Sequence, residues 1–368
     1  MAWYITKKDI PFISIGAKFL GCGGGGDTVT SEFLLESVMK ENDKVRVLSF
    51  TELTTEFILS LAMAGSPVLY SEQLPRGDEG TRVIENYERL SDIKVDALVS
   101  IEIGGMNALT PIITALQTNL PVVDGDGMGR AFPEFTMTTF NFFNIPFSPA
   151  SIIDVQQNAH TITCKDNNEA IDKTRELINN EGGIIHISCF GAVARKVKHS
   201  MIPGSLSLAR SIGKVLDSKK KRSLKIKELE EVLDNSVYSK PVLIMEGTIK
   251  EVSRYFEKGQ IRGNLSVTGN EAFKGKKADI VFHNEYLLVK QQGRTRVSVP
   301  DLIILMDART LIPLTTNEVQ EGMTINIFSI TAPNVLRTRS ILDFVGPKAF
   351  GQEEDYQPLT KWKENELL

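Results

Sequence analysis

Residues 45–123 alternate short apolar segments with longer amphipathic ones, and this alternation constrains the fold more than any other feature of the chain. Strands are expected at residues 45–50, 66–70, 97–101 and 121–123, and helices at residues 51–64, 78–90 and 108–118. Strands separated by helices are typical of a parallel sheet whose crossover helices cover its faces. The chain is therefore expected to begin with an α/β domain whose sheet is mainly parallel.

The second half of the chain has a different pattern. Two helices are expected within residues 205–234, and short strands separated by turn residues fill residues 240–340. Many short strands with turn signals between them are typical of a β-rich domain, either a sandwich or a barrel. Because 368 residues exceed what one ordinary core holds, we predict two domains, residues 1–168 and residues 169–368.

Composition and charge exclude several classes of protein. Lys and Arg number 42 and Asp and Glu number 46, so the net charge of −4 gives no general attraction to nucleic acid. The basic run at residues 219–222 is interpreted as a solvated helix end. No apolar run reaches the roughly 18 residues of a membrane span, and the first residues lack the pattern of a signal peptide. The three widely spaced cysteines do not suggest a disulfide framework. We expect a cytoplasmic protein without nucleic-acid or membrane partners.

A glycine-rich loop precedes an expected helix near the start of the chain. Five of the six residues at 21–26 are glycine, and Asp27 is a good N-cap residue before an apolar helical pattern. Such a junction offers main-chain N–H groups and the positive end of a helix dipole to a ligand. The loop lacks the spacing of a phosphate-binding P-loop or a dinucleotide fingerprint. We predict that it binds a substrate, with a tight turn without ligand as the alternative; the residues concerned are Gly23, Gly24, Gly25, Gly26 and Asp27.

A second glycine-rich stretch, residues 121–139, places Asp124 and Asp126 between glycines, with Arg130 just beyond. Two carboxylates this close need a positive neighbour, which Arg130, a metal ion or a substrate with N–H donors would supply. The alternative is a polar turn whose aspartates cap the following segment. Ligands of open α/β sheets bind beyond the carboxyl ends of the strands. The glycine loop, residues 102–107 and residues 124–130 are therefore expected to lie together.

His186 and Cys189 lie on an expected strand at residues 184–192 that enters a turn of small residues. A histidine on an apolar strand is commonly part of the core, and a cysteine there is commonly a small buried hydrophobe. A thiol at the start of a turn is also where a nucleophile or a metal ligand is placed. A divalent metal is a further candidate, because zinc suits a set of Cys, His and Asp ligands. No CxxC, HxxxH or HExxH spacing supports it.

Six separated motifs together resemble a known family. They are LGCGGGGD at residues 20–27, GGMNA at 104–108, PVVDGDGMGRAFPE at 121–134, HNEYL at 283–287, VPDLI at 299–303 and VGPKAFG at 345–351. In this order they resemble the bacterial S-methyl-thiohydantoin desulfurase-like family, and the resemblance spans nearly the whole chain. It implies an N-terminal α/β domain, a C-terminal β-rich domain and an association with hydantoinase and oxoprolinase genes. Cys22 departs from the small or hydroxyl residue of many relatives, which leaves its role open.

The activity that the resemblance implies is hydrolytic loss of methanethiol from an S-methylated thiohydantoin ring, giving a hydantoin. This reaction needs a nucleophile, a base and N–H donors that hold the developing charge. Candidates for the base, the nucleophile or a metal ligand are Asp124, Asp126, His186 and Cys189. Candidates for holding the substrate are the glycine-loop amides and Asn107 for ring carbonyls and Arg130 for a carboxylate.

A second class of function fits the same residues. The chain would then be a non-catalytic accessory subunit that binds a hydantoinase-type or oxoprolinase-type partner, or a small ligand, through these loops. An assay of the chain alone separates the two functions, because an accessory subunit is silent without its partner. We also expect a homo-oligomer. The sequence leaves the substrate side chain and the identity of any metal open.

Overall fold

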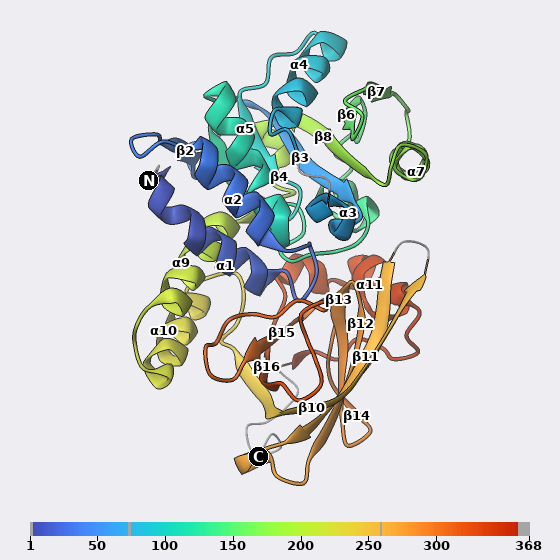
Figure 1. Cartoon of the computed structure of the whole chain (residues 1–368). Coiled ribbons are helices and arrows are strands. Elements are labelled where there is room, and N and C mark those ends of the chain that lie inside the picture. The colour runs from blue at the N-terminus through green and yellow to red at the C-terminus, as the bar shows by residue number, and fades with distance from the viewer. Residues whose placement is uncertain (1–2, 73–74, 258–259, 360–368) are drawn as a thin grey trace.

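The computed structural model of the protein describes residues 3–72, 75–257 and 260–359. Two sheets dominate it. A mixed sheet with helices packed around it forms one half of the molecule, and an antiparallel sheet forms the other (Figure 1). The expected fold class, an α/β domain followed by a β-rich domain, is confirmed.

Within the described residues, the first sheet has nine strands in the order β1-β2-β5-β4-β3-β8-β6-β7, with β9 paired to β5. They are β1 (Trp3–Ile5), β2 (Val45–Leu48), β3 (Phe57–Gly65), β4 (Ala97–Ser100), β5 (Val122–Asp126), β6 (Ala150–Asp154), β7 (Ala159–Ile162), β8 (Ile184–Val193) and β9 (Ile202–Pro203). The pairings among β2, β5, β4 and β3 are parallel. The pairings of β1, β6, β7, β8 and β9 are antiparallel. The parallel centre is the part that the alternating pattern predicted.

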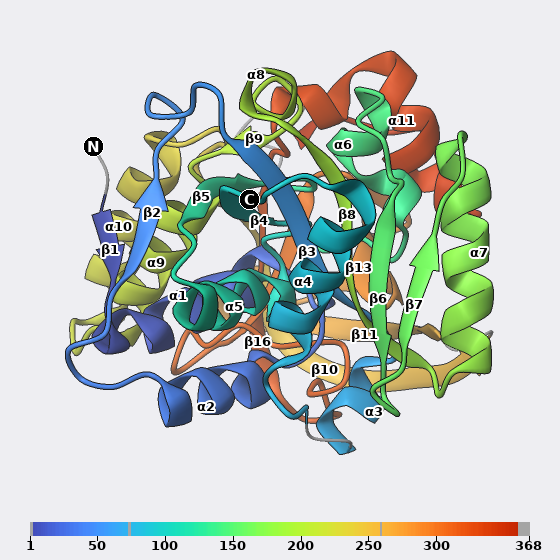
Figure 2. The same ribbon diagram turned by 90° about the horizontal axis from the view of Figure 1, so that it is seen from above.

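Helices surround this sheet. They are α1 (Ile10–Leu20), α2 (Thr28–Val38), α3 (Pro67–Glu72), α4 (Glu79–Ser91), α5 (Thr110–Thr118), α6 (Thr139–Phe142), α7 (Asn167–Asn180), α8 (Ala194–Val197), α9 (Ser205–Asp217) and α10 (Arg222–Asp234). α4 packs against β6 and β8, and α5 packs against β3 and β4. Figure 2 shows α7 beside the β6–β7 hairpin at one edge of the sheet, with β1 and β2 at the other.

Two sequence predictions within the first sheet are wrong. The helix predicted at residues 51–64 is replaced by strand β3, and the strand predicted at residues 66–70 is replaced by helix α3. β3 lies between β4 and β8 and is buried along most of its length, so its apolar run lacks the alternation that marks a half-exposed strand. Pro67 begins α3, in agreement with the preference for proline at the first helical position.

The two sheets divide the chain later than the predicted domain boundary between residues 168 and 169. Strand β8 joins the first sheet between β3 and β6, and β9 pairs with β5. Helix α9 packs along α1, also in the first half. The second sheet begins only at Val242. Measured by its sheets, the first half therefore extends at least to Pro203.

The second sheet is antiparallel throughout, in the order β14-β13-β12-β11-β10-β16-β15. Its strands are β10 (Val242–Glu257), β11 (Gln260–Gly269), β12 (Lys277–His283), β13 (Glu285–Gln291), β14 (Arg294–Ser298), β15 (Leu302–Asp307) and β16 (Thr324–Ile330). Helix α11 (Arg339–Val345) follows, and short 3₁₀ helices occur at Lys7–Asp9, Gly105–Ala108, Phe135–Met137, Glu271–Phe273, Asn334–Arg337 and Pro347–Phe350.

Alternate residues of β15 face two different hydrophobic cores. Leu302 and Ile304 belong to the core that continues into the first half of the molecule. Ile303 and Leu305 belong to a separate core on the opposite face. The side-chain period of two in a strand explains this division. Because one core extends through both halves, apolar packing joins the two sheets.

Three further expectations from the sequence can be compared with the structure. All three cysteines are free, as their number and spacing predicted. Within the described ranges, no helix combines the length and the apolar character needed to cross a bilayer. In the polar C-terminal segment, residues 352–368, the aromatic residues Tyr356 and Trp362 are the docking points that the sequence predicts. The hydroxyl of Tyr356 donates a hydrogen bond of 3.0 Å to Oδ2 of Asp301. Trp362, the other predicted docking residue, lies outside the described residues.

Helices α1 and α9 approach each other so closely that glycine is needed at the contact. A Cβ atom on Gly16 of α1 would lie 1.8 Å from the main-chain oxygen of Ala209. A Cβ atom on Gly213 of α9 would lie 1.8 Å from the main-chain oxygen of Phe12. Both distances are far below van der Waals contact. The close contact fixes the end of α1, from which the glycine loop emerges.

The change Gly16→Ala is expected to lower the free energy of unfolding by about 1–3 kcal/mol, because the backbones of two helices must move apart. This loss exceeds the gain in helix propensity of roughly 1 kcal/mol that alanine brings. Urea unfolding followed by circular dichroism measures the difference. Glu85→Ala, at an exposed position of α4, is the control and is expected to change stability by less than about 0.5 kcal/mol. A Gly16→Ala variant as stable as the parent would contradict the described contact.

Candidate active site

A cavity of about 470 Å³ lies between the two halves of the molecule, at the junction seen in Figure 1. The first half lines it with residues 23–27, the end of β3, the segment after β4 and residues 132–135. The second half contributes residues 284–285 and 315–318, together with Phe256 and Ile261. This volume falls in the range of roughly 300–1,000 Å³ that small-molecule sites occupy. The cavity is therefore the candidate active site.

The glycine loop, residues 21–27, is held by the second half of the molecule. The main-chain oxygen of Cys22 accepts a hydrogen bond of 2.8 Å from the N–H of Tyr286. The main-chain oxygen of Gly23 accepts one of 2.9 Å from the N–H of Thr316. The predicted substrate-binding residues of this loop all line the cavity. Their conformation depends on contacts that lie more than 250 residues away in the sequence.

The glycine loop also packs main chain against main chain with the turn after β4. The N–H of Met106 donates a hydrogen bond of 2.9 Å to the oxygen of Gly25. A Cβ atom on Gly25 would lie 2.4 Å from the oxygen of Gly104, and one on Gly105 would lie 2.0 Å from the oxygen of Gly25. Both Gly25 and Gly105 have positive φ, which other residues rarely adopt. These glycines bring the loop and the turn together, as the sequence predicted for residues 21–27 and 102–107.

Glu102 follows β4 and lines the cavity with a side chain that is held in place. Its Oε1 accepts a hydrogen bond of 2.8 Å from Nδ2 of Asn107, and its Oε2 accepts one of 3.3 Å from the N–H of Phe132. Asn107 is itself fixed, because its amide group exchanges hydrogen bonds with the main-chain N–H and oxygen of Met63. Asn107 lines the cavity as well. Its amide, which the sequence assigned to the substrate ring, thus positions Glu102.

Glu285 begins β13 and reaches the same cavity from the second half of the molecule. A Cβ atom on Gly24 would lie 2.2 Å from Oε1 of Glu285, so the absence of a side chain at Gly24 leaves space for the carboxyl group. The main-chain N–H of Gly25 acts to lower the pKa of this carboxyl group. Within the described part of the chain, Oε2 of Glu285 is buried without a hydrogen-bond partner. Such an atom is costly to bury and is suited to receive a proton or a ligand.

The two glutamates have similarly raised proton affinities. Burial raises the pKa of Glu102 to about 8, with a contribution from the charge of Glu285 and an opposing one from the hydrogen bond of Asn107. Burial raises the pKa of Glu285 to about 8 as well, and the guanidinium group of Arg130 opposes it. Two coupled carboxyl groups do not ionise in one step. Because the charge of Arg130 opposes the rise for Glu285 and no cation does so for Glu102, Glu285 is the first of the pair to lose its proton as the pH rises.

The described lining of the cavity contains acidic side chains and no basic ones. Among the described residues that line it, every charged side chain is acidic, namely Asp27, Glu72, Glu102, Glu134, Glu285 and Glu318. Two of these acids are paired with cations outside the lining, Glu134 with Arg175 at 2.7 Å and Glu318 with Lys18 at 2.6 Å. An anionic ligand would meet repulsion here. A neutral ring with N–H donors, or a cation, suits the lining better.

Asp124 and Asp126 lie on strand β5, which continues through both residues, so the prediction that the strand ends at residue 123 and that a loop holds the two aspartates is wrong. Neither residue belongs to the described lining of the cavity. Oδ1 of Asp124 accepts a hydrogen bond of 2.9 Å from the N–H of Ser207 in the first turn of α9. Oδ2 of Asp126 accepts hydrogen bonds of 2.7–3.0 Å from the main-chain N–H groups of Ile103, Met128 and Gly129. Asp126 thus caps the segment that follows it, as the alternative predicted, whereas Asp124 binds the first turn of the distant helix α9.

Arg130 lies away from the position expected of a substrate ligand. Its side chain is fully buried and does not contribute to the described cavity lining. It stacks over the ring of Phe132 at 5.0 Å. Its N–H groups donate hydrogen bonds of 3.0–3.3 Å to the main-chain oxygens of Ala131, Tyr286, Pro300 and Asp301. Arg130 therefore joins the first half of the molecule to the second.

His186 and Cys189 lie on β8, and neither is part of the described cavity lining. Burial lowers the pKa of His186, against the opposing charge of Glu79. Burial raises the pKa of the Cys189 thiol to about 12 and that of the Cys22 thiol to about 11. Thiols with such values stay protonated at neutral pH and are weak nucleophiles. Of the described residues, one group of three metal-binding side chains lies within reach of a common ion, and it contains none of these residues.

No local sequence pattern singled out Glu285, and Glu102 was expected only as part of the segment at residues 102–107. Both residues carry a signal. Glu285 lies within the motif at residues 283–287, and Glu102 lies two residues before the motif at residues 104–108. A polar, ionisable residue inside such a motif is the kind of signal that identifies a candidate site.

Family models match nearly the whole chain. The model of the S-Me-THD-like N-terminal domain matches residues 8–164, and the model of the S-Me-THD-like C-terminal domain matches residues 165–359. The chain belongs to the S-Me-THD-like family. The recognition based on the six motifs is thereby confirmed. The boundary between the two family models lies between residues 164 and 165, close to the predicted boundary at residues 168 and 169. The first sheet of the structure, in contrast, also includes β8 and β9, which lie beyond this boundary.

The S-Me-THD-like chain also resembles a solved structure. A protein from Chromobacterium violaceum, known from a crystal structure, matches with a TM-score of 0.81 and 20% sequence identity, over 97% of this chain and 100% of that one. At this identity the likeness shows the fold alone. No curated protein matches the chain.

The raised pKa of Glu102 predicts a pH dependence of stability. The pKa of the Glu102 carboxyl group is near 4.5 when it is unperturbed and about 8 in the folded protein. The folded state therefore holds the proton more tightly, and this stabilisation is lost as the pH rises from about 4.5 through about 8. The change Glu102→Gln removes the ionisation. The variant is expected to match the parent near pH 4 and to exceed its free energy of unfolding at pH 9 by on the order of 5 kcal/mol.

Urea unfolding of both proteins at pH 4, 6 and 9 tests this expectation. Glu85→Gln, at an exposed position of α4, is the matched control and should leave the pH dependence unchanged. A parallel pH profile for Glu102→Gln and the parent would show that Glu102 does not retain its proton in the folded state.

Proposed function

We propose that this chain is a hydrolase that removes the methylthio group from an S-methyl-thiohydantoin-type ring, giving a hydantoin and methanethiol. The observation that carries the proposal is the pair Glu102 and Glu285. They reach one cavity from different halves of the molecule, and Oε2 of Glu285 has no partner within the described structure. Membership of the S-Me-THD-like family supports the class of ring.

The cavity suits a small neutral heterocycle. Its acidic lining disfavours a free carboxylate, whereas the N–H and C=O groups of the ring match carboxyl groups and main-chain amides. Apolar side chains of Met63, Met128 and Phe132 line the same space and suit a methylthio group. The residues of the glycine loop precede the N-terminus of α2, so their amides are suited to hold a ring oxygen.

The environment of each glutamate sets its role. Arg130 favours the ionised form of Glu285, which makes this residue the general base. Glu102 has no cation among the groups that shift its pKa, and the charge of Glu285 keeps it protonated, which makes it the general acid. Asn107 is a positioning residue, because it holds Oε1 of Glu102.

The proposed reaction balances with one water molecule. Glu285 takes a proton from water while the water oxygen attacks the ring carbon that carries the sulfur. The C=N electron pair moves to the ring nitrogen, which receives the proton of Glu102. The tetrahedral intermediate then loses its hydroxyl proton to Glu102, the C–S bond breaks, and the sulfur leaves with the proton held by Glu285. The products are a hydantoin and methanethiol, and both glutamates return to their starting states.

The change Glu285→Gln is expected to lower kcat/KM by about 10²–10⁴-fold, because it removes the base while retaining the shape of the side chain. Methanethiol release from synthetic S-methyl-thiohydantoins, followed with a thiol reagent, measures the rate. Asp124→Asn serves as the comparison and should stay within about threefold of the parent, because Asn retains an oxygen that accepts the bond from Ser207. An active Glu285→Gln beside an inactive Asp124→Asn would favour the aspartate assignment from the sequence and overturn the proposal.

The assay of the purified chain alone also tests the alternative function. A parent protein that is silent toward S-methyl-thiohydantoins and hydantoins, and that gains activity only with a hydantoinase-type partner, would identify an accessory subunit. Turnover by the chain alone, lost in Glu285→Gln and retained in Glu85→Gln, supports the hydrolase.

The pH dependence of kcat/KM follows from the two raised pKa values. The rate is expected to rise as the pH approaches about 8, because Glu285 must lose its proton, and to fall above about 8, because Glu102 must keep its own. The two apparent pKa values of this pH profile describe the coupled pair of glutamates and not either residue alone. Glu102→Gln should be slower than the parent and should lose the alkaline limb. A parent rate that is flat between pH 6 and 10 would contradict this acid–base assignment.

A further inference from the structure

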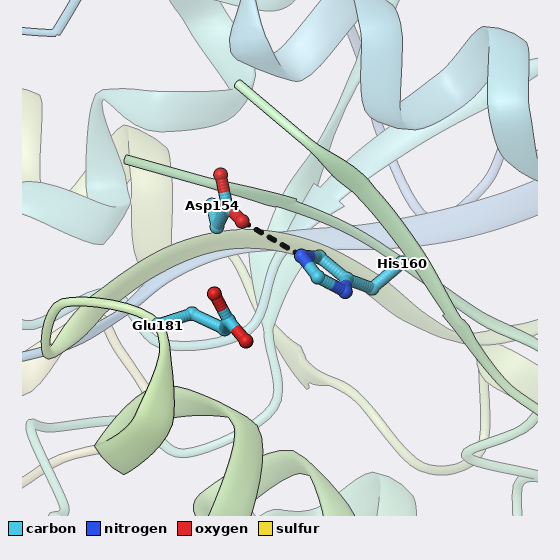
Figure 3. A group of neighbouring side chains, drawn as sticks. All are labelled: Asp154, His160 and Glu181. Atoms are coloured by element: carbon cyan, nitrogen blue, oxygen red, sulfur yellow. Dashed lines mark hydrogen bonds and ion pairs between the residues drawn. The ribbon is translucent and has the colours of Figure 1, made fainter. Parts of the chain in front are cut away.

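Three side chains with metal-binding atoms converge at the edge of the first sheet, on elements that the proposed active site does not use. Asp154 ends β6, His160 lies on β7, and Glu181 follows α7 (Figure 3). One ligand atom from each residue lies within 4.8 Å of those of the other two. No other set of three in the described ranges meets this condition. The three elements are consecutive in the chain, and β6 and β7 pair as an antiparallel hairpin.

The carboxylate of Asp154 is held in one orientation by its neighbours. Its Oδ1 accepts a hydrogen bond of 2.8 Å from the N–H of Asn158, and its Oδ2 accepts one of 3.0 Å from Nδ2 of Asn158. The N–H of Gln157 donates a bond of 3.0 Å to the main-chain oxygen of Asp154, which closes the turn. Outer-shell hydrogen bonds of this kind orient the carboxylates that bind metals.

Nε2 of His160 faces the other two groups. It lies 2.7 Å from Oδ2 of Asp154. Asp154 is almost fully buried, whereas His160 and Glu181 are partly exposed. An ion would thus reach a buried carboxylate from the open side of the hairpin.

We infer that Asp154, His160 and Glu181 form a site for a divalent transition metal, with zinc as the expected ion. One imidazole and two carboxylates are ligands that Zn²⁺ accepts, and three protein ligands leave a fourth position for water. Ca²⁺ prefers six to eight oxygen ligands and Mg²⁺ prefers octahedral oxygen sites, so neither suits this set. The competing explanation is a simple ion pair between His160 and Asp154, with Glu181 as a bystander.

A metal at this position would fasten an edge hairpin to the end of a helix. It would also act on the rim of the cavity, because Glu181 begins the turn that leads to Gly183. The main-chain oxygen of Gly183 accepts a hydrogen bond of 2.9 Å from the N–H of Ser66, and Ser66 lines the cavity. The site is therefore a structural clamp near the proposed active site, and the inference does not depend on the proposed reaction.

Isothermal titration of the tag-free, chelator-treated full chain with Zn²⁺ tests the site. One Zn²⁺ per chain is expected, with a rise in Tm of about 2–4 °C or more at saturation, and no effect of Mg²⁺ at the same concentration. His160→Gln and Glu181→Gln should each weaken Zn²⁺ binding by at least about tenfold, and Asn158→Ala by about 10–100-fold. Glu181 is partly exposed, so its variant is expected to fold normally. Hydrogen exchange in residues 181–186 should slow when Zn²⁺ is added.

His199→Gln is the matched control, because His199 is exposed and lies outside the group. It should bind Zn²⁺ as the parent does. The chain has four histidines, so NMR of the imidazole nitrogens identifies the ligand directly, and His160 should be the one that shifts. Absence of Zn²⁺ binding, or equal binding by the parent, His160→Gln and Glu181→Gln, would overturn the inference and leave the ion pair as the explanation.

Discussion

The buried guanidinium group of Arg130 is the interaction on which the arrangement of the molecule depends. A charge with no access to water is tolerated only when polar groups surround it, and here the main-chain oxygens of Tyr286, Pro300 and Asp301 supply them from the second half. Tyr286 is adjacent to Glu285 in the chain, so the same contact fixes the start of β13. It also draws negative charge toward Glu285. One side chain thereby sets both the docking of the halves and the polarity of the cavity.

Much of the fold follows from local sequence patterns. Segments with a clear period, such as α4 and α9, lie close to where the sequence predicts them, because each buries one face. The secondary-structure predictions fail where a segment is buried on all sides. The strand β3 is covered on both sides and therefore shows neither period, and only its position between β4 and β8 identifies it. The antiparallel partners of β8 could not be predicted either, since nothing local records pairing between distant strands.

The site was predictable in part. The glycine loop and the turn after β4 lie together, as the rule for the carboxyl ends of parallel strands implies. The aspartates of β5 attracted attention because they are acids beside glycines, yet their oxygens bind main-chain N–H groups. An acidic residue beside glycines can bind a ligand or form a structural hydrogen bond with the main chain. Only its three-dimensional surroundings determine which of the two it does. Glu285 lies in the other domain, and its nearness to Glu102 is a product of docking that no local pattern encodes.

The division of the glutamate pair between the halves has a consequence for how the molecule tolerates change. Glu102 moves with the first sheet and Glu285 with the second, so a small rigid-body displacement of one half alters the gap between the two carboxyl groups while leaving each domain intact. Substitutions at the interface, remote from the cavity, would thus alter the proton transfer proposed for this pair without unfolding the protein. In the proposed hydrolase, this interface is a place where reactivity can change separately from substrate recognition.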